Sequence, residues 1–291
     1  MKYILILILG FFNLIASTAF ISPSQLKNSL TDKKTIIIDV ADYSIYKSAH
    51  IKGAINANIS NFIKEDSLYS ELNSNEILEN EIKNLGISYD SNVIIYAHNT
   101  QIGILNSSYL AFVLIYAGFE NISILDGGYL SWVFENELLV SSLKESSVKE
   151  TNFTIKTNKN ILSTNKYLSK NLKSATIIDA RSPELYYGIK RSDKTKRTGH
   201  ISYAKSSFYL HKFLADTTLR KMDELKKIYI DGYGLKKTDN IIVCSDDIFS
   251  ASMEWYILYK EMGFKNTKIY YNSIQEWAND PELPMTRFKW E

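Results

Sequence analysis

An internal repeat constrains the fold of this chain more than any other sequence feature. Two β-branched runs that end in aspartate, at Asp39 and Asp179, are each followed seven residues later by a tyrosine. Further matches follow in the same order, and such ordered recurrence indicates two copies of one unit of about 120 residues. The later matches are His50-Ile51 with His200-Ile201 after an insertion of ten residues, Gly86 with Gly234, Asn92 to Tyr96 with Asn240 to Cys244, and Gly118-Phe119 with Gly263-Phe264.

Each copy alternates buried-strand patterns with helical patterns. Strands are expected in the first copy at residues 35–40, 93–96 and 122–125, with helices at 106–118 and over most of 61–85. In the second copy a strand at Ile241 to Val243 precedes a helix expected from Ser250 to Met262. This alternation predicts the α/β class, with two domains that are each a mostly parallel sheet flanked by helices. We place the domains at residues 20–145 and 146–291, joined by a polar linker around residues 141–157.

The first nineteen residues form a separate unit. Lys2 gives a positive start, residues 3–16 are apolar, and Ser17-Thr18-Ala19 offers small residues to a signal peptidase. The apolar run is shorter than the roughly 20 residues that a spanning helix needs. We therefore expect a signal peptide at residues 1–19, export to the periplasm or beyond the cell, and no stable membrane insertion after cleavage. An uncleaved anchor is the alternative.

Charge and motifs exclude several classes of partner. The chain has 34 basic and 32 acidic residues, a net charge of +2 that argues against nucleic-acid binding. It lacks the glycine-rich nucleotide-binding motifs, so no cofactor is expected. The histidines show no metal-ligand spacing, so no metal site is expected either, and the oligomeric state stays open. They are His50, His98, His200 and His211.

The stretch from Asn240 to Ser252 contains the only cysteine of the chain. Cys244 ends the expected strand and precedes a helix, so loop N–H groups and the helix N-terminus would point at a group held there. Such a position stabilises a thiolate, which makes Cys244 a candidate nucleophile. The alternative is that Cys244 is a small apolar residue that closes a core strand.

Several motifs in the second copy are jointly specific. They are Asp179-Ala-Arg-Ser-Pro-Glu, Gly199-His200-Ile201, the strand and loop at Cys244, Gly263-Phe264, Tyr271 to Trp277, and Pro281-Glu-Leu-Pro284. Together they resemble the tandem-domain rhodaneses, the family of thiosulfate and 3-mercaptopyruvate sulfurtransferases, over nearly all of the mature chain.

The resemblance implies a non-catalytic first domain and a second domain whose loop cysteine becomes a persulfide. Sulfane sulfur would move from a small anionic donor to a thiol or cyanide acceptor. The resemblance thus assigns catalysis to Cys244. It assigns donor binding to Arg181 and to the loop residues Ser245, Asp246, Asp247, Ile248, Phe249 and Ser250.

The repeat tests the position of the cysteine. Counting eleven residues from Gly86 and from Gly234 reaches Ala97 and Ser245, so Tyr96 and Cys244, one residue earlier, share the last position of the strand. In the family that this chain resembles, an aromatic residue occupies this last strand position and the nucleophile occupies the following one, where this chain has Ser245. A thiol in strand conformation would point away from the loop amides. Alternatively the loop begins one residue sooner, spans Cys244 to Phe249 and turns the thiol inward.

Charge in the loop is a second departure from the resemblance. Asp246 and Asp247 should raise the pKa of a neighbouring thiol and repel an anionic donor, unless they cap the following helix. The ten-residue insertion either restores a positive rim or is a solvated loop; its basic residues are Lys190, Arg191, Lys194, Lys196 and Arg197. Two hypotheses remain: an exported sulfurtransferase, or a catalytically inactive binding module, because Ala97 and Ser245 occupy the two nucleophile positions.

Overall fold

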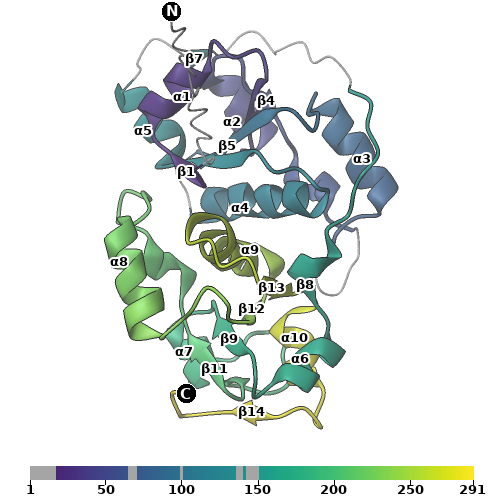
Figure 1. Cartoon of the computed structure of the whole chain (residues 1–291), viewed down its shortest axis with the longest axis vertical. Coiled ribbons are helices and arrows are strands. Elements are labelled where there is room, and N and C mark those ends of the chain that lie inside the picture. Colours follow the sequence, from purple (N-terminus) through teal and green to yellow (C-terminus); the bar gives the residue numbers. More distant parts are fainter. Residues whose placement is uncertain (1–17, 65–70, 99–100, 136–139, 142–150) are drawn as a thin grey trace, which may run out of the picture.

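The computed structural model describes residues 18–64, 71–98, 101–135, 140–141 and 151–291, and it contains two α/β units in succession (Figure 1). Each unit is built on a five-stranded sheet in which every neighbouring pair is parallel. In spatial order the first sheet contains β4 (Ile55–Asn56), β2 (Thr35–Asp39), β5 (Asn92–Tyr96), β6 (Ile122–Leu125) and β1 (Phe20–Ile21). The second contains β11 (Ala204–Ser206), β9 (Thr176–Asp179), β12 (Ile241–Cys244), β13 (Thr267–Tyr270) and β8 (Leu162–Ser163).

The two sheets have the same strand order, which confirms the repeat. A pair of short antiparallel strands accompanies each sheet: β3 (His50–Ile51) with β7 (Val140–Ser141), and β10 (His200–Ile201) with β14 (Met285–Thr286). The predicted α/β fold with two parallel sheets is therefore confirmed.

Helices cover both faces of each sheet (Figure 1). Those of the first unit are α1 (Pro23–Ser29), α2 (Tyr43–Ser48), η1 (Ile59–Phe62), α3 (Asn75–Asn84), α4 (Gln101–Tyr116) and α5 (Gly128–Glu135). Those of the second are η2 (Lys159–Ile161), α6 (Asn165–Asn171), α7 (Pro183–Tyr187), η3 (Tyr209–Lys212), α8 (Met222–Lys226), η4 (Lys227–Gly232), α9 (Ile248–Tyr256), η5 (Ile257–Glu261) and α10 (Ser273–Asn279). The long helix expected over residues 61–85 is shorter, because α3 begins only after its N-cap Ser74.

The two units share one hydrophobic core, in which α4 packs against α9 (Figure 1). The rings of Phe112 and Trp255 meet edge to face, with their centroids 5.5 Å apart. The Tyr256 hydroxyl donates to two carbonyl oxygens of the first unit, those of Ala19 (3.0 Å) and Ile122 (3.1 Å). Apolar side chains and buried hydrogen bonds therefore connect the two units along a seam between α4 and α9. One face of each sheet packs against this shared core.

The opposite face of each sheet packs in a separate cluster. In the second unit, Ile241 and Val243 belong to the shared core, whereas Ile242 and Cys244 belong to an outer cluster with Leu168 of α6 and with Ile274 and Trp277 of α10. This division follows from the alternation of side chains along a strand.

Two expectations concern residues that the structure describes only in part. The expected signal peptide falls outside the described residues up to position 17, and most of the expected linker lies in the undescribed range 142–150. Within the residues that are described, no helix has the length and apolar character that crossing a membrane requires.

Candidate functional site

Cys244 is the last residue of β12, at the carboxyl edge of the second sheet. It pairs with Asp179 of β9, just as Tyr96 pairs with Asp39 in the first sheet. The register deduced from the repeat is therefore confirmed, and Ser245 takes the position that Ala97 takes in the first unit.

The Cys244 thiol faces the outer cluster and not the loop. Its side chain is completely buried, among apolar neighbours that include Ile177, Ile201 and Ile274. Burial raises the pKa of the thiol well above its usual value, and the nearby Asp179 carboxylate raises it further against the opposing effect of Arg181. A thiol in this setting stays protonated at neutral pH and has no open approach for a sulfur donor.

The loop after β12 is shorter than the alternative register requires. Helix α9 begins at Ile248, so only Ser245, Asp246 and Asp247 connect strand and helix. Asp247 is the N-cap residue of α9: its Oδ1 accepts the Ser250 N–H (2.8 Å) and its Oδ2 accepts the Ser250 hydroxyl (3.1 Å). The structure thus corrects the six-residue loop and the helix start at Ser250, because the cap fixes the first turn two residues earlier.

Three residues that we assigned to donor binding in the loop belong instead to the first turn of α9. Ile248 and Ser250 are buried. Phe249 packs against Tyr109 of α4, with ring centroids 4.7 Å apart. The helix N-terminus, where loop amides would hold an anion, already carries the Asp247 carboxylate.

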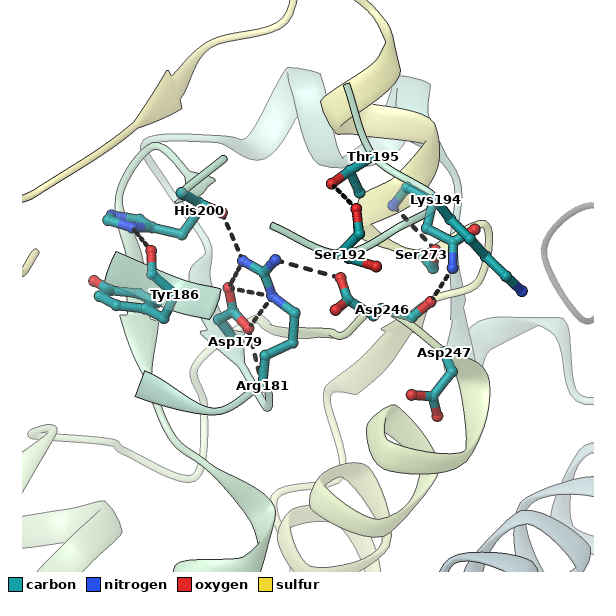
Figure 2. Close-up of polar contacts among 12 residues, drawn as sticks. Asp179, Arg181, Tyr186, Ser192, Lys194, Thr195, His200, Asp246, Asp247 and Ser273 are labelled. Carbon is teal, nitrogen blue, oxygen red and sulfur yellow. Dashed lines mark hydrogen bonds and ion pairs between the residues drawn. The ribbon is translucent and has the colours of Figure 1, made fainter. Parts of the chain in front are cut away.

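Arg181 is brought to the candidate site, but its donors are occupied (Figure 2). Its Nε lies 2.9 Å from Oδ1 and its Nη2 2.6 Å from Oδ2 of Asp179. Nη2 also donates to the Gly199 carbonyl oxygen (2.8 Å), and Nη1 lies 3.3 Å from Asp246 Oδ1. The guanidinium therefore neutralises two carboxylates of the chain itself, the buried one of Asp179 and the half-buried one of Asp246.

Arg181 contacts the side chain of Asp246, and Gln275 contacts its main chain. Burial raises the pKa of its carboxyl group, while Arg181 acts in the opposite direction. Its carbonyl oxygen accepts a hydrogen bond from the Gln275 side chain (2.5 Å) at the start of α10. The sequence contained no signal for Gln275 as a partner of this loop, since the contact spans 29 residues along the chain.

In the first unit the equivalent buried carboxylate, that of Asp39, is paired with a tyrosine and a histidine. The Tyr96 hydroxyl donates to Asp39 Oδ2 (2.6 Å), and Nε2 of His98 lies 3.2 Å from the same oxygen. Tyr96 holds the place of Cys244, and His98 that of Asp246. A buried aspartate at the end of the second strand is thus paired in both units.

The inserted loop docks on α10 and does not present all of its charges to the site. The guanidinium of Arg197 donates to the carbonyl oxygens of Trp277 (2.8 Å), Ala278 (3.1 Å) and Leu283 (2.8 Å) and to that of Asp280. The other four basic residues of the insertion are exposed. Among the described residues, no group of three or more His, Cys, Asp or Glu side chains is arranged to hold a metal ion.

Comparison with known proteins gives the family. The family model described as a rhodanese-like domain matches residues 22–135 and again residues 164–280. The chain belongs to the rhodanese-like family. The resemblance found in the sequence is confirmed, and the chain is a tandem rhodanese.

The relatives of this tandem rhodanese are distant. A putative thiosulfate sulfurtransferase of Mycolicibacterium smegmatis is 24% identical over 271 residues, which cover 90% of this chain and 95% of that protein. The sulfur carrier protein TtuD of Thermus thermophilus is 27% identical over 117 residues, 38% of this chain and 41% of that protein. Several curated relatives are matched over only 38% to 43% of their own length.

Among solved structures, that of YnjE superposes with a TM-score of 0.80 at 20% identity, covering 93% of this chain and 68% of that one. At this identity the likeness describes the fold. The chemistry has to be argued from the residues of this chain.

Proposed function

We propose that this tandem rhodanese is a binding module that does not carry sulfur on Cys244. The observation that supports this proposal most strongly is the direction of the thiol. Cys244 is fully buried on the outer face of its sheet, and Ser245 follows it in the position of the family nucleophile. A hydroxyl group cannot form a persulfide, and a buried protonated thiol is a poor nucleophile.

The surroundings of the loop support the same proposal. Arg181 and the N-terminus of α9 are the two features that could attract an anionic donor, and carboxylates of the chain already engage both. A thiosulfate ion would have to displace Asp179, Asp246 or Asp247 from a charged hydrogen bond. Such hydrogen bonds to charged groups are about twice as strong as neutral ones, so their displacement opposes donor binding.

The second candidate is the exported sulfurtransferase, in which Cys244 takes sulfur from thiosulfate or 3-mercaptopyruvate and passes it to a thiol or cyanide. It is favoured by family membership and by relatives named thiosulfate sulfurtransferase. Export, through a signal peptide at residues 1–19, is part of either proposal and is supported by the apolar run that follows Lys2.

Intact mass spectrometry separates the two candidates. The purified chain is incubated with thiosulfate or with 3-mercaptopyruvate and compared with the Cys244→Ala variant. We expect no added sulfur atom on the native chain, while alkylation after unfolding shows that the Cys244 thiol was free throughout. A sulfur adduct on the native chain that is lost in Cys244→Ala would overturn the binding-module proposal.

A further inference from the structure

A hollow of about 340 Å³ lies at the seam between the two units, on the opposite side from the candidate loop. It is bordered by the turn that follows α4, at Gly118 to Glu120, and by residues of η5 and the turn after it, at Tyr259, Lys260 and Lys265. These turns precede strands β6 and β13, whereas the loop at Cys244 follows β12. Since the strands are parallel, the hollow and the candidate loop lie at opposite edges of the sheets.

The repeat places equivalent residues of both units around this hollow. Ile115 and Lys260 each stand three residues before the matched glycines Gly118 and Gly263, and Glu120 and Lys265 each stand two residues after them. All four side-chain positions line the hollow. The first unit therefore contributes an apolar residue and one carboxylate, and the second contributes two ammonium groups.

The two ammonium groups of the hollow form no ion pair with the described part of the chain. Among the described residues, no carboxylate lies within ion-pair distance of Lys260 or Lys265. The Lys260 ammonium donates to the Glu120 carbonyl oxygen (2.7 Å), and the Lys265 ammonium lies 4.4 Å from the centroid of the Tyr259 ring. Each ammonium group has three N–H donors, so both keep donors for a further acceptor.

Electrostatics around Lys260 agrees with this geometry. Its pKa is lowered to about 8, chiefly by burial and also by the neighbouring Lys265, while Glu120 opposes the change in part. Burial lowers the pKa of Lys265, and the ammonium group of Lys237 lowers it as well. Like charges that lie close together repel each other, and an anion between them removes that repulsion.

We propose that the hollow lined by Lys260 and Lys265 binds a small oxyanion that carries two or more negative charges, of the phosphate or sulfate type. Lys260 and Lys265 contact the anion from the second unit, and the backbone at Gly118 closes the site from the first. Because the ligand touches both units, it stabilises their mutual packing. The site is independent of Cys244 and of the function proposed for the loop.

Calorimetric titration of the full chain with pyrophosphate, inorganic phosphate and sulfate, at constant ionic strength, tests the proposal. The double variant Lys260→Met, Lys265→Met should weaken binding at least tenfold. The matched control Lys190→Met, Lys194→Met loses the same charge from the exposed insertion and should leave binding within about twofold. The three anions separate phosphate chemistry from sulfate chemistry by their relative affinities.

A variant that is expected to strengthen anion binding gives a second test. Glu120→Gln removes the carboxylate of the hollow while its carbonyl oxygen remains, so affinity should rise several-fold. Absence of binding to the native chain, or equal losses in the two double variants, would overturn the site.

A measurement on the native chain covers the case in which the double variant fails to fold. The rate of Lys260 acetylation by acetic anhydride is followed against pH by peptide mass spectrometry. Pyrophosphate should slow this acetylation and move its midpoint upward from about 8, because the bound anion favours the charged amine. Affinity should correspondingly fall as the pH rises through that value, with Lys265, Lys237 and Glu120 as the charged neighbours. An unchanged acetylation profile contradicts the proposal.

Discussion

Arg181 holds the carboxylate of Asp179 through two of its nitrogen atoms, Nε at 2.9 Å from Oδ1 and Nη2 at 2.6 Å from Oδ2. The fixed geometry of the guanidinium matches the two carboxylate oxygens, which makes such pairs strong. The pair is buried, and Asp246 joins it from the loop. The arrangement makes Arg181 a structural counter-ion at the edge of the sheet.

Replacing Arg181 by Gln should therefore cost stability more than ligand binding. The buried Asp179 and the half-buried Asp246 would lose their counter-ion, and breaking a buried pair such as that of Arg181 with Asp179 costs about 3–5 kcal/mol. Arg220→Gln is the matched control, because Arg220 pairs with Glu224 near the surface and such a pair is worth at most about 1 kcal/mol. Urea unfolding of both variants measures the difference. Equal losses would contradict the structural role of Arg181.

The sequence predicted the sheet and the position of Cys244 because both depend on local or repeated patterns. Because two copies in one chain can be aligned with each other, the match with Tyr96 favours Cys244 as the last strand residue, as the structure has it. The direction of the thiol stayed open in the sequence, and the early start of α9 at Ile248 decides it in favour of the strand conformation.

The partners of Arg181 and Arg197 could not be predicted in the same way. Arg181 occupied the position at which the family resemblance places a donor-binding residue, and only the folded loop brings Asp246 against it. Arg197 lies in an insertion without a counterpart in the first unit, and its acceptors are main-chain carbonyls about 80 residues later. The start of α9 could not be predicted because an aspartate at position 247 fits a loop as well as a helix N-cap, and the local pattern does not distinguish the two.

The N-cap of α9 gives a second prediction. Asp247→Ala should lower the free energy of unfolding by about 0.5–2 kcal/mol, since the Ser250 N–H loses its acceptor. Asp247→Asn keeps an acceptor oxygen and should lose only a fraction of that. Thermal unfolding of both variants checks the order. Alkylation of native Cys244 should stay slow in each, because the thiol faces the other side of the sheet; faster alkylation in Asp247→Ala would place the thiol in the loop.

The buried thiol predicts a pH dependence of stability. The pKa of Cys244 is raised in the folded chain above the unfolded value of about 8.5. Below that pH both states hold the proton. Above it the unfolded state loses its proton first, so stability falls by up to about 1.4 kcal/mol per pH unit until the folded pKa is reached.

Cys244→Val isolates this contribution from the many tyrosines that titrate at high pH. The difference in unfolding free energy between the native chain and Cys244→Val, measured by urea unfolding from pH 7 to 10, should be constant up to about pH 8 and then shift against the native chain. A difference that does not change over this range would show that the thiol titrates normally.

A buried ion pair between Lys212 of η3 and Glu254 of α9 gives the last prediction. The ammonium lies 3.3 Å from Glu254 Oε2, and both side chains are excluded from solvent. Ser207 and Tyr229 donate to Oε1 of the same carboxylate, at 2.6 and 2.9 Å. In the first unit Phe62 and Tyr109 hold the matching positions, so the fold itself does not require charges there.

Lys212→Met and Glu254→Gln should each cost about 3–5 kcal/mol, because each leaves one buried charge without its partner. The double variant leaves no unpaired charge, and it should lose clearly less than the sum of the two single losses. Urea unfolding of the three variants gives the coupling energy. Additive losses would mean that the two groups do not depend on each other and would contradict the ion pair.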